Sequence, residues 1–292
     1  MSFPNALFPA PEVVAANSQG YVFRQKQVAL AVNIALATKR PLLVTGLPGS
    51  GKSSLAKAVA DVLGWGYISH VFTSRTRVED LIVDVDLVRR LNDAQSSRKI
   101  GGEADYQIPG ALWWAVSPSS AAARKLAVRP PGLRDDNERD VVVLLDEIDK
   151  AEPDLPNDLL IPLDHLELTI ASVGRVRPEH HQVLVVITSN GEREMPPAFV
   201  RRCVVLDIKE QDEEFLVEVA RSHLGERDDD LYLNVAKELT TAQNSAEAAN
   251  RRMPSTAEFL DTVRACIRFD QQPGSDLWEA IAQTTLVKTD NR

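Results

Sequence analysis

A glycine-rich octapeptide, GLPGSGKS, occupies residues 46–53 and restricts the folds that this chain can adopt. It matches the pattern G-x-x-x-x-G-K-[ST] in full. The apolar run PLLVT at residues 41–45 predicts a buried strand before it, and residues 52–63 have the pattern of a helix. In such a strand–loop–helix unit the glycines let backbone N–H groups surround phosphate oxygens, and the helix N-terminus adds partial positive charge. The motif therefore predicts an α/β fold with a phosphate site.

The positions of the octapeptide have separate expected roles. Lys52 would reach the β- and γ-phosphates of a nucleotide, and the Ser53 hydroxyl would bind Mg²⁺. The expected phosphate-binding residues are Gly46, Pro48, Gly49, Ser50, Gly51, Lys52, Ser53 and Ser54. The alternative is a glycine-rich helix cap with an idle lysine, and the order strand, loop, helix disfavours it.

Two adjacent carboxylates, Asp146 and Glu147, close the strongest apolar run of the chain, VVVLL at residues 141–145. Such a pair at a strand end is costly without a cation, so Asp146 is expected to hold Mg²⁺ through water. Glu147 would orient or deprotonate the attacking water. The alternative is a solvated turn with acidic caps, and Asp149 is expected to be a helix cap or a supporting group rather than a metal ligand.

Asn190 follows another apolar run, residues 183–188. An amide at that strand end is suited to hold the lytic water or the γ-phosphate. The alternative is a plain turn, because Asn190 and Gly191 form a common turn pair.

The remaining pattern divides the chain into three parts. Residues 1–20 read as an extended lead-in, residues 21–209 as an α/β nucleotide-binding domain, and residues 210–292 as a helical domain. Within the second part we expect further strands at 67–73 and 203–208, helices at 24–38, 86–95 and 153–163, a turn or short hairpin at 106–110 and a hairpin at 166–176. In the third, acidic residues 212–214 begin one helix, and the capping box of Ser255 and Glu258 begins another.

Charge and composition exclude several classes of protein. The formal net charge of −9 argues against a chain that coats DNA or an anionic membrane. We find no apolar run of membrane-spanning length and no signal peptide, and Cys203 and Cys266 fit no metal spacing, so a cytoplasmic protein with reduced thiols is expected. The chain also lacks an Asn-Lys-x-Asp guanine signature, which favours ATP over GTP.

The order of these parts resembles the AAA+ ATPases, and more narrowly their MoxR-type branch. The segments that carry the resemblance are IPGALW at 108–113, LLDEIDKAEPDLPNDLLIPLD at 144–164 and TSNGEREMPPAFVRRC at 188–203. It extends over about residues 20–270 and is weaker in the helical part. The resemblance implies a P-loop AAA+ core, in which helices sandwich a parallel sheet, followed by a small all-helical lid. It also implies a ring oligomer, with a hexamer as the expected form.

The resemblance gives the arginines of the chain expected roles. Arg201 and Arg202 occupy the slot of the arginine finger, which reaches the γ-phosphate held by the neighbouring subunit. The alternative is a solvated helix end whose arginines pair with helix carbonyls. Sensor 2, an arginine of the lid, would be Arg251 or Arg252, and we choose Arg252 as a nucleotide-binding residue. The MoxR pattern has this arginine within the first helical turn, where this chain has residues 254–256.

A few other residues admit two interpretations each. A core position is expected for Trp113 and Trp114, with a pore or partner surface as the alternative. A solvated loop is expected for His180 and His181, with a metal site as the alternative. A solvated loop is also expected for Arg75 and Arg77, with a pore lining as the alternative, and an adenine pocket is expected to begin at Val22 and Phe23.

These observations together indicate Mg²⁺-dependent ATP hydrolysis that remodels or activates a protein. By resemblance, the partner would be a protein with a von Willebrand factor A domain. A nucleotide-controlled signalling or defence switch with slow hydrolysis is the first alternative. A nucleic-acid motor is the second, and the acidic charge disfavours it. A binding-only scaffold would fit a degenerate octapeptide or the loss of Glu147, and the chain has neither.

Overall fold

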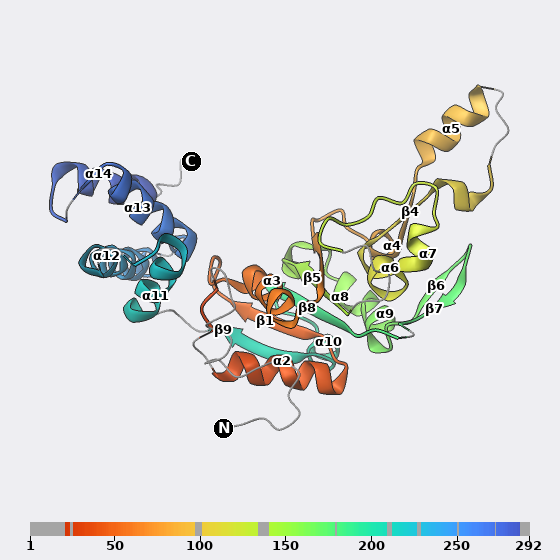
Figure 1. Cartoon of the computed structure of the whole chain (residues 1–292), viewed down its shortest axis with the longest axis horizontal. Helices are drawn as coiled ribbons and strands as arrows, with labels where there is room; N and C mark the ends of the chain where they lie inside the picture. The colour runs from red at the N-terminus through yellow and green to blue at the C-terminus, as the bar shows by residue number, and fades with distance from the viewer. Residues whose placement is uncertain are drawn as a thin grey trace.

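The computed structural model describes most of the chain and shows an α/β part followed by a group of helices (Figure 1). The described residues are 21–23, 26–96, 101–133, 140–178, 180–208, 212–226, 229–249, 251–271 and 273–286. The expected lead-in at residues 1–20 and the expected helix start at Arg24 lie outside them, as does the expected boundary near residue 210.

A five-stranded parallel sheet forms the centre of the α/β part, in the order β2-β5-β8-β1-β9. Its strands are β1 (Leu42–Gly46), β2 (Gly66–Val71), β5 (Val141–Asp146), β8 (Val183–Ser189) and β9 (Val204–Ile208). The expected parallel sheet is therefore confirmed. The strands β1, β5 and β8 come from apolar runs, as is usual for strands that are covered on both faces.

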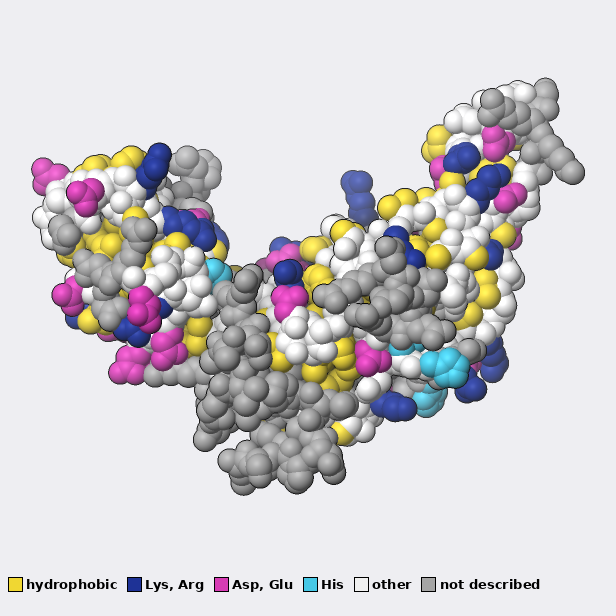
Figure 2. Space-filling view, in the orientation of Figure 1, with side chains coloured by type: hydrophobic (Ala, Val, Ile, Leu, Met, Phe, Trp, Pro, Cys, Tyr) yellow, Lys and Arg dark blue, Asp and Glu magenta, His cyan; other side chains and the backbone are white. Residues whose placement is uncertain are grey.

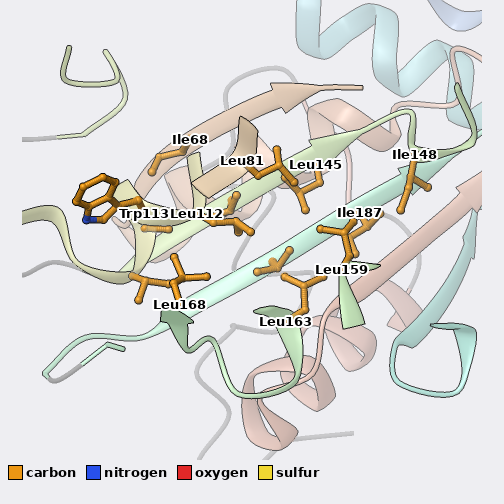
Figure 3. Packing of buried hydrophobic residues seen from close by; sticks show 14 of the residues in the cluster. Ile68, Leu81, Leu112, Trp113, Leu145, Ile148, Leu159, Leu163, Leu168 and Ile187 are labelled. Carbon is orange, nitrogen blue, oxygen red and sulfur yellow. The ribbon is translucent and has the colours of Figure 1, made fainter. Parts of the chain in front are cut away.

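Side chains of successive strand residues enter two different cores, one on each face of the sheet. On β5, Val143 and Leu145 pack into one core, while Val142 and Leu144 pack into the other. Helices α2 (Lys26–Thr38) and α3 (Lys52–Leu63) cover the second face. Figure 3 shows part of the first core, where sheet residues meet α6 (Ala111–Val116) and α9 (Leu160–Asp164).

The two adjacent tryptophans belong to the first core. Trp113 and Trp114 are 0% and 3% exposed, and Trp113 Nε1 donates a hydrogen bond of 2.8 Å to Ser120 Oγ in α7 (Pro118–Ala122). Their expected core position is confirmed. The alternative, a pore or partner surface, is wrong, because side chains buried to this extent have no free face to offer.

Part of the chain between β2 and β5 forms a projection. It runs through α4 (Val78–Ile82), β3 (Val83–Val85), α5 (Leu87–Gln95), η1 (Glu103–Tyr106) and β4 (Gln107–Pro109). The expected helix at 86–95 is confirmed, with Asp86 as its N-cap. The segment at 106–110 forms no hairpin of its own: β4 pairs antiparallel with β3. The helix α5 comes between these strands in the chain and extends away from the body of the molecule (Figure 1).

The segment after β5 also differs from its expected form. The single helix expected at 153–163 is instead divided into α8 (Leu155–Asp158) and α9, after the 3-10 turn η2 (Ile148–Lys150). Pro162 has no N–H to donate to the carbonyl of Asp158, so a continuous helix would leave that carbonyl without its bond. The hairpin expected at 166–176 is present as β6 (Leu168–Ile170) and β7 (Gly174–Val176).

In the described residues from 212 onward the regular secondary structure is helical, and these helices have a core of their own. They are α11 (Glu213–Leu224), α12 (Asp229–Ala248), α13 (Thr256–Arg268) and α14 (Asp276–Thr285). Both expected helix starts are confirmed: Asp212 accepts a hydrogen bond of 2.7 Å from Phe215 N, and Ser255 and Glu258 form the capping box. Among the described residues, no helix is long and apolar enough to cross a membrane.

Candidate functional site

The parallel sheet brings the expected phosphate and metal groups to one edge. Gly46 pairs in register with Ile208, Val71 with Asp146, and Thr45 with Ser189. The carboxyl ends of β1, β5 and β8 therefore lie together. Asp146 ends β5, Asn190 follows β8, and Lys52 begins α3 after the loop that follows β1. This edge is where ligands bind in open parallel sheets.

Lys52 is a buried cation inside the glycine-rich loop. Its side chain is 5% exposed, and Nζ donates hydrogen bonds of 2.8 Å to Gly46 O and 2.7 Å to Leu47 O. Burial lowers the pKa of this lysine, and the nearby carboxylates, Asp149 above all, oppose that shift. An ammonium group in this position, beside the N-terminus of α3, is suited to bind phosphate.

Asp146 is the centre of a small network of oxygen atoms. Its Oδ1 accepts hydrogen bonds from Ser53 Oγ at 2.7 Å and from Thr188 Oγ1 at 2.5 Å. Hydroxyl and carboxylate oxygens are the ligands that Mg²⁺ prefers, so these residues fit the expected ion. Thr188 was not among the expected site residues, although it stands next but one to Asn190 at the same strand end.

Glu147 has a strained backbone and a fixed side chain. Its φ and ψ are 60° and 50°, a left-handed conformation that costs energy in any residue with a Cβ and is often found at functional sites. Its N–H donates to Thr188 Oγ1 at 2.9 Å, and its Oε2 accepts a hydrogen bond of 2.7 Å from Lys150 Nζ. That bond raises the pKa of Lys150. The carboxylate thus lies at the site, but paired with a cation.

Asn190 lies at the same site, directly before a bend at residues 191–193. Its backbone N–H donates to Asp149 Oδ2 at 2.9 Å. The alternative interpretation invoked an Asx-turn, which would direct Glu192 N to the Asn190 side chain. Glu192 N instead donates to Asp149 Oδ2 at 3.1 Å, and Gly191 N donates to Ser189 Oγ at 3.1 Å. The amide of Asn190 is left available to line the cavity at this edge.

That cavity has a volume of about 320 Å³ and lies between the sheet edge and the helices of the C-terminal part. Figure 2 shows the recess between these two regions. The α/β part lines it with Tyr21, Val22, Pro48, Gly49, Ser50, Gly51, Lys52, Ser53, Ser54, Asp146, Glu147, Thr188 and Asn190. The helices add Phe215, Val219, His223, Thr256, Ala257 and Leu260. The apolar members of this wall suit the base of a nucleotide, and of the pair expected there Val22 lines the cavity while Phe23 is buried.

One contact joins the glycine-rich loop directly to the helices. A Cβ placed on Gly49 would lie 2.1 Å from Ser255 Cβ, and the φ of Gly49 is +76°. Both the space and the backbone conformation therefore require glycine here. The N-terminus of α13 consequently lies against the loop, where Thr256 and Ala257 line the cavity.

Arg201 and Arg202 lie at the opposite edge of the sheet. They precede β9, whose Val204 pairs with Leu42 at the start of β1. The four residue steps from there to the carboxyl edge span about 13 Å. Both side chains are exposed, and Arg202 Nε lies 3.5 Å from Asp164 Oδ1. These arginines are therefore remote from the phosphate site of their own chain.

A third arginine holds the turn that carries them. Arg40 Nε donates to Arg202 O at 3.0 Å, and Arg40 Nη2 donates to Arg201 O. It is thus Arg40, rather than Arg201 or Arg202, that bonds the carbonyls at this helix end. Arg40 and Arg202 also line a second cavity, of about 990 Å³, at this edge.

The lid arginines lie away from the nucleotide cavity. Arg252 Nη1 donates to Glu258 Oε1 at 3.1 Å, and neither Arg251 nor Arg252 is among the residues that line the cavity. The sequence places residues 254–256 where the related pattern has its arginine, and the structure places Thr256 at the cavity. The sensor-2 role of Arg252 stays a prediction.

The other polar pairs are in the α/β part. Arg75 and Arg77 are exposed, as expected for a solvated loop. His180 is exposed too, whereas His181 Nε2 lies 2.8 Å from Ala115 O and so joins its loop to α6. Within the described ranges, no group of three histidine, cysteine, aspartate or glutamate side chains forms a metal site.

Comparison with known families decides the wider assignment. Residues 41–203, more than half of the chain, match the family model of the AAA domain, dynein-related subfamily. The chain belongs to this family. As an AAA protein it is of the ATPase class, and the P-loop AAA+ fold expected from the sequence is confirmed by its sheet and its helical C-terminal part.

The AAA protein is also similar to a chaperone. It is 33% identical over 160 residues to the chaperone protein ClpB of Enterococcus faecalis (strain ATCC 700802 / V583). The match covers 53% of this chain but 15% of that protein. The similarity therefore leaves most of the chaperone without a counterpart in this chain.

Proposed function

We propose that this AAA protein is a Mg²⁺-dependent ATPase of the MoxR-type branch. It would act as a ring, a hexamer by family resemblance, and would remodel or activate a partner protein. The observation that carries the proposal is the position of Arg201 and Arg202 at the sheet edge opposite Lys52. A chain built in this way needs a neighbour to complete its site. The similarity to ClpB, a chaperone protein, supports remodelling, and resemblance favours a partner with a von Willebrand factor A domain.

In this proposal each residue at the carboxyl edge has one task. Lys52 and the loop N–H groups bind the β- and γ-phosphates, and Glu147 orients or deprotonates water with Asn190 beside it. Ser53 and Asp146 would hold Mg²⁺, which when bound neutralises charge on the phosphate oxygens. A guanidinium from the neighbour, Arg201 or Arg202, would stabilise the charge that develops in the transition state.

Hydrolysis per subunit, measured as the protein concentration rises, tests this proposal. We expect specific activity to increase with concentration and Glu147→Gln to abolish it. Arg201→Ala or Arg202→Ala should lower activity by about 10³-fold or more, as loss of a trans arginine does elsewhere. The matched control is Arg264→Ala, because Arg264 is an exposed lid arginine that pairs with Asp261 at 3.1 Å. Activity that stays constant while the protein is monomeric would overturn the shared site.

One observation favours a second function, a switch with slow hydrolysis. The carboxylate of Glu147 accepts a hydrogen bond of 2.7 Å from Lys150 Nζ. Glu147 would therefore act as a base only after the two side chains separate. In a switch, ATP would control assembly and turnover would act as a timer. Lys150→Met should then raise the basal rate of the full chain. An unchanged or lower rate in that variant would remove the reason for preferring a switch.

A further inference from the structure

Two loops at the carboxyl edge hold each other through their side chains. One follows β5 and contains Glu147 and Asp149; the other follows β8 and contains Asn190. Asp149 is 3% exposed, and its Oδ2 accepts hydrogen bonds from Asn190 N at 2.9 Å and Glu192 N at 3.1 Å. A single buried carboxylate oxygen of the first loop thus fixes the backbone of the second.

A side chain of the second loop also bonds the backbone of the first loop. Arg193 Nη2 donates hydrogen bonds to Asp149 O and Ala151 O. Each loop therefore contributes one side chain that binds two backbone groups of the other. We call this pair of side chains, Asp149 and Arg193, the loop clamp.

The loop clamp lies beyond the last paired residues of β5 and β8. The pairing of β5 with β8 ends at Leu145 and Ile187. Beyond that point Thr188 Oγ1 bonds Glu147 N, and the clamp makes the next connections. The clamp thus continues the alignment of the two strands into their loops, as far as the two candidate catalytic groups.

We propose that Asp149 and Arg193 are positioning residues, which set the amide of Asn190 relative to the carboxylate of Glu147. The inference rests on the proposed function, since it names what aligns that same site. Neither clamp residue lines the nucleotide cavity, so both act through other residues. Two polar groups that share one water or one phosphate must be held to a fraction of an ångström, and misplacement by about 1 Å can cost about 100-fold in rate.

The chemistry of Asp149 fits positioning better than stability alone. Its Oδ1 is buried and has no hydrogen-bond partner among the described residues. A buried carboxylate with an unpaired oxygen is destabilising. The chain therefore retains a costly group at this place.

The test compares a removing and a conserving substitution at each clamp residue, in the full chain at a concentration that gives maximal specific activity. Asp149→Ala removes the acceptor, while Asp149→Asn keeps an oxygen for both N–H groups. Arg193→Met removes the donor, while Arg193→Lys keeps one nitrogen for both carbonyls. We expect the removing variants to lower kcat by about 100-fold. Their Kd for a non-hydrolysable ATP analogue should stay within about twofold, and the conserving variants should recover most of the rate.

A double variant provides a second readout. Because the two side chains act as one unit, Asp149→Ala combined with Arg193→Met should be no slower than the slower single variant. If Asp149→Ala fails to fold, Arg193→Met carries the test, since the Arg193 side chain is only half-buried. Parallel loss of nucleotide affinity and rate, without recovery by Asn or Lys, would mean a merely structural role and would overturn the inference.

Glu147→Gln and Asn190→Ala separate this inference from the proposed function. If both lower kcat and the clamp variants do not, the loop clamp is refuted and the proposed function stands. If neither lowers kcat, the proposed function fails, and the clamp has nothing to position.

Discussion

The contact between Gly49 and Ser255 predicts that a single methyl group in the glycine-rich loop will displace the helical part. In Gly49→Ala the new Cβ would lie 2.1 Å from Ser255 Cβ and 2.9 Å from Ser255 Oγ. No flexible side chain can move to relieve this overlap, because Ser255 is the N-cap of α13 and is bonded to Glu258. The helix must therefore shift as a body away from the loop.

Two terms contribute to the expected effect. The left-handed conformation at φ +76° costs an alanine about 1–2 kcal/mol, and overpacking adds about 1–3 kcal/mol. Only the second term moves α13, which supplies part of the cavity wall. A loss of about 1–3 kcal/mol corresponds to about 5- to 150-fold weaker nucleotide binding.

Two further variants distinguish the terms. Gly64→Ala places the same methyl group at φ +69° with nothing within 4 Å, so it should lower the free energy of unfolding and leave nucleotide affinity unchanged. Adding Ser255→Gly to Gly49→Ala removes the clashing Cβ at a cost of only a few tenths of a kcal/mol as an N-cap. The assay is the Kd for a fluorescent ATP analogue, with thermal unfolding in parallel. If the double variant binds as weakly as Gly49→Ala alone, the contact does not set the position of the lid.

Further predictions concern the charge, the metal and the core. Burial lowers the pKa of Lys52 below 10.5, so between its folded and unfolded values the unfolded chain binds more protons and stability rises with pH. Lys52→Met should remove this rise, measured as the wild-type minus variant free energy of unfolding in urea at neutral and alkaline pH. Asp146→Asn should weaken Mg²⁺ binding in the presence of an ATP analogue by about 10- to 100-fold, measured by Mg²⁺ titration. Trp113→Ala should lower the free energy of unfolding by about 3–5 kcal/mol, and an unchanged melting temperature would contradict the core position.

The part of the site that could be predicted from the sequence depends on strand ends. Apolar runs before Gly46, Asp146 and Asn190 identify three strands without any tertiary information. Because parallel strands share a carboxyl edge, the groups that follow them must meet there. The octapeptide then identifies the ligand class, so this half of the cavity follows from local pattern and one topological rule.

The rest of the cavity depends on packing between distant parts of the chain. Phe215, Val219 and His223 lie on α11, where their spacing looks like that of any amphipathic helix. Nothing local indicates that this helix face lines the cavity. The hydrogen bonds of Thr188 and of the loop clamp are equally non-local, since they join residues about forty positions apart in separate loops.

Two errors in the expected elements have specific physical causes. Residues 106–110 have the appearance of a local turn, but their strand partner β3 lies before α5, and a pairing across an inserted helix leaves no short-range signal. Residues 153–163 have helical composition, and Pro162 divides the helix at a point that the apolar pattern alone does not reveal.

The opposite placement of Lys52 and the Arg201–Arg202 turn has a genetic consequence. Under the proposed function every active site is formed by two chains, one that supplies the loop and one that supplies the arginine. A chain with Lys52→Ala still donates its arginines, and a chain with Arg201→Ala and Arg202→Ala still offers an intact loop. Two inactive alleles should therefore complement each other when co-expressed. A chain that carries both defects, expressed alone, should stay inactive. By the same logic, a single defective allele mixed with the wild type should lower activity only in proportion to its share of the chains, because each defective chain disables one of the two sites in which it takes part.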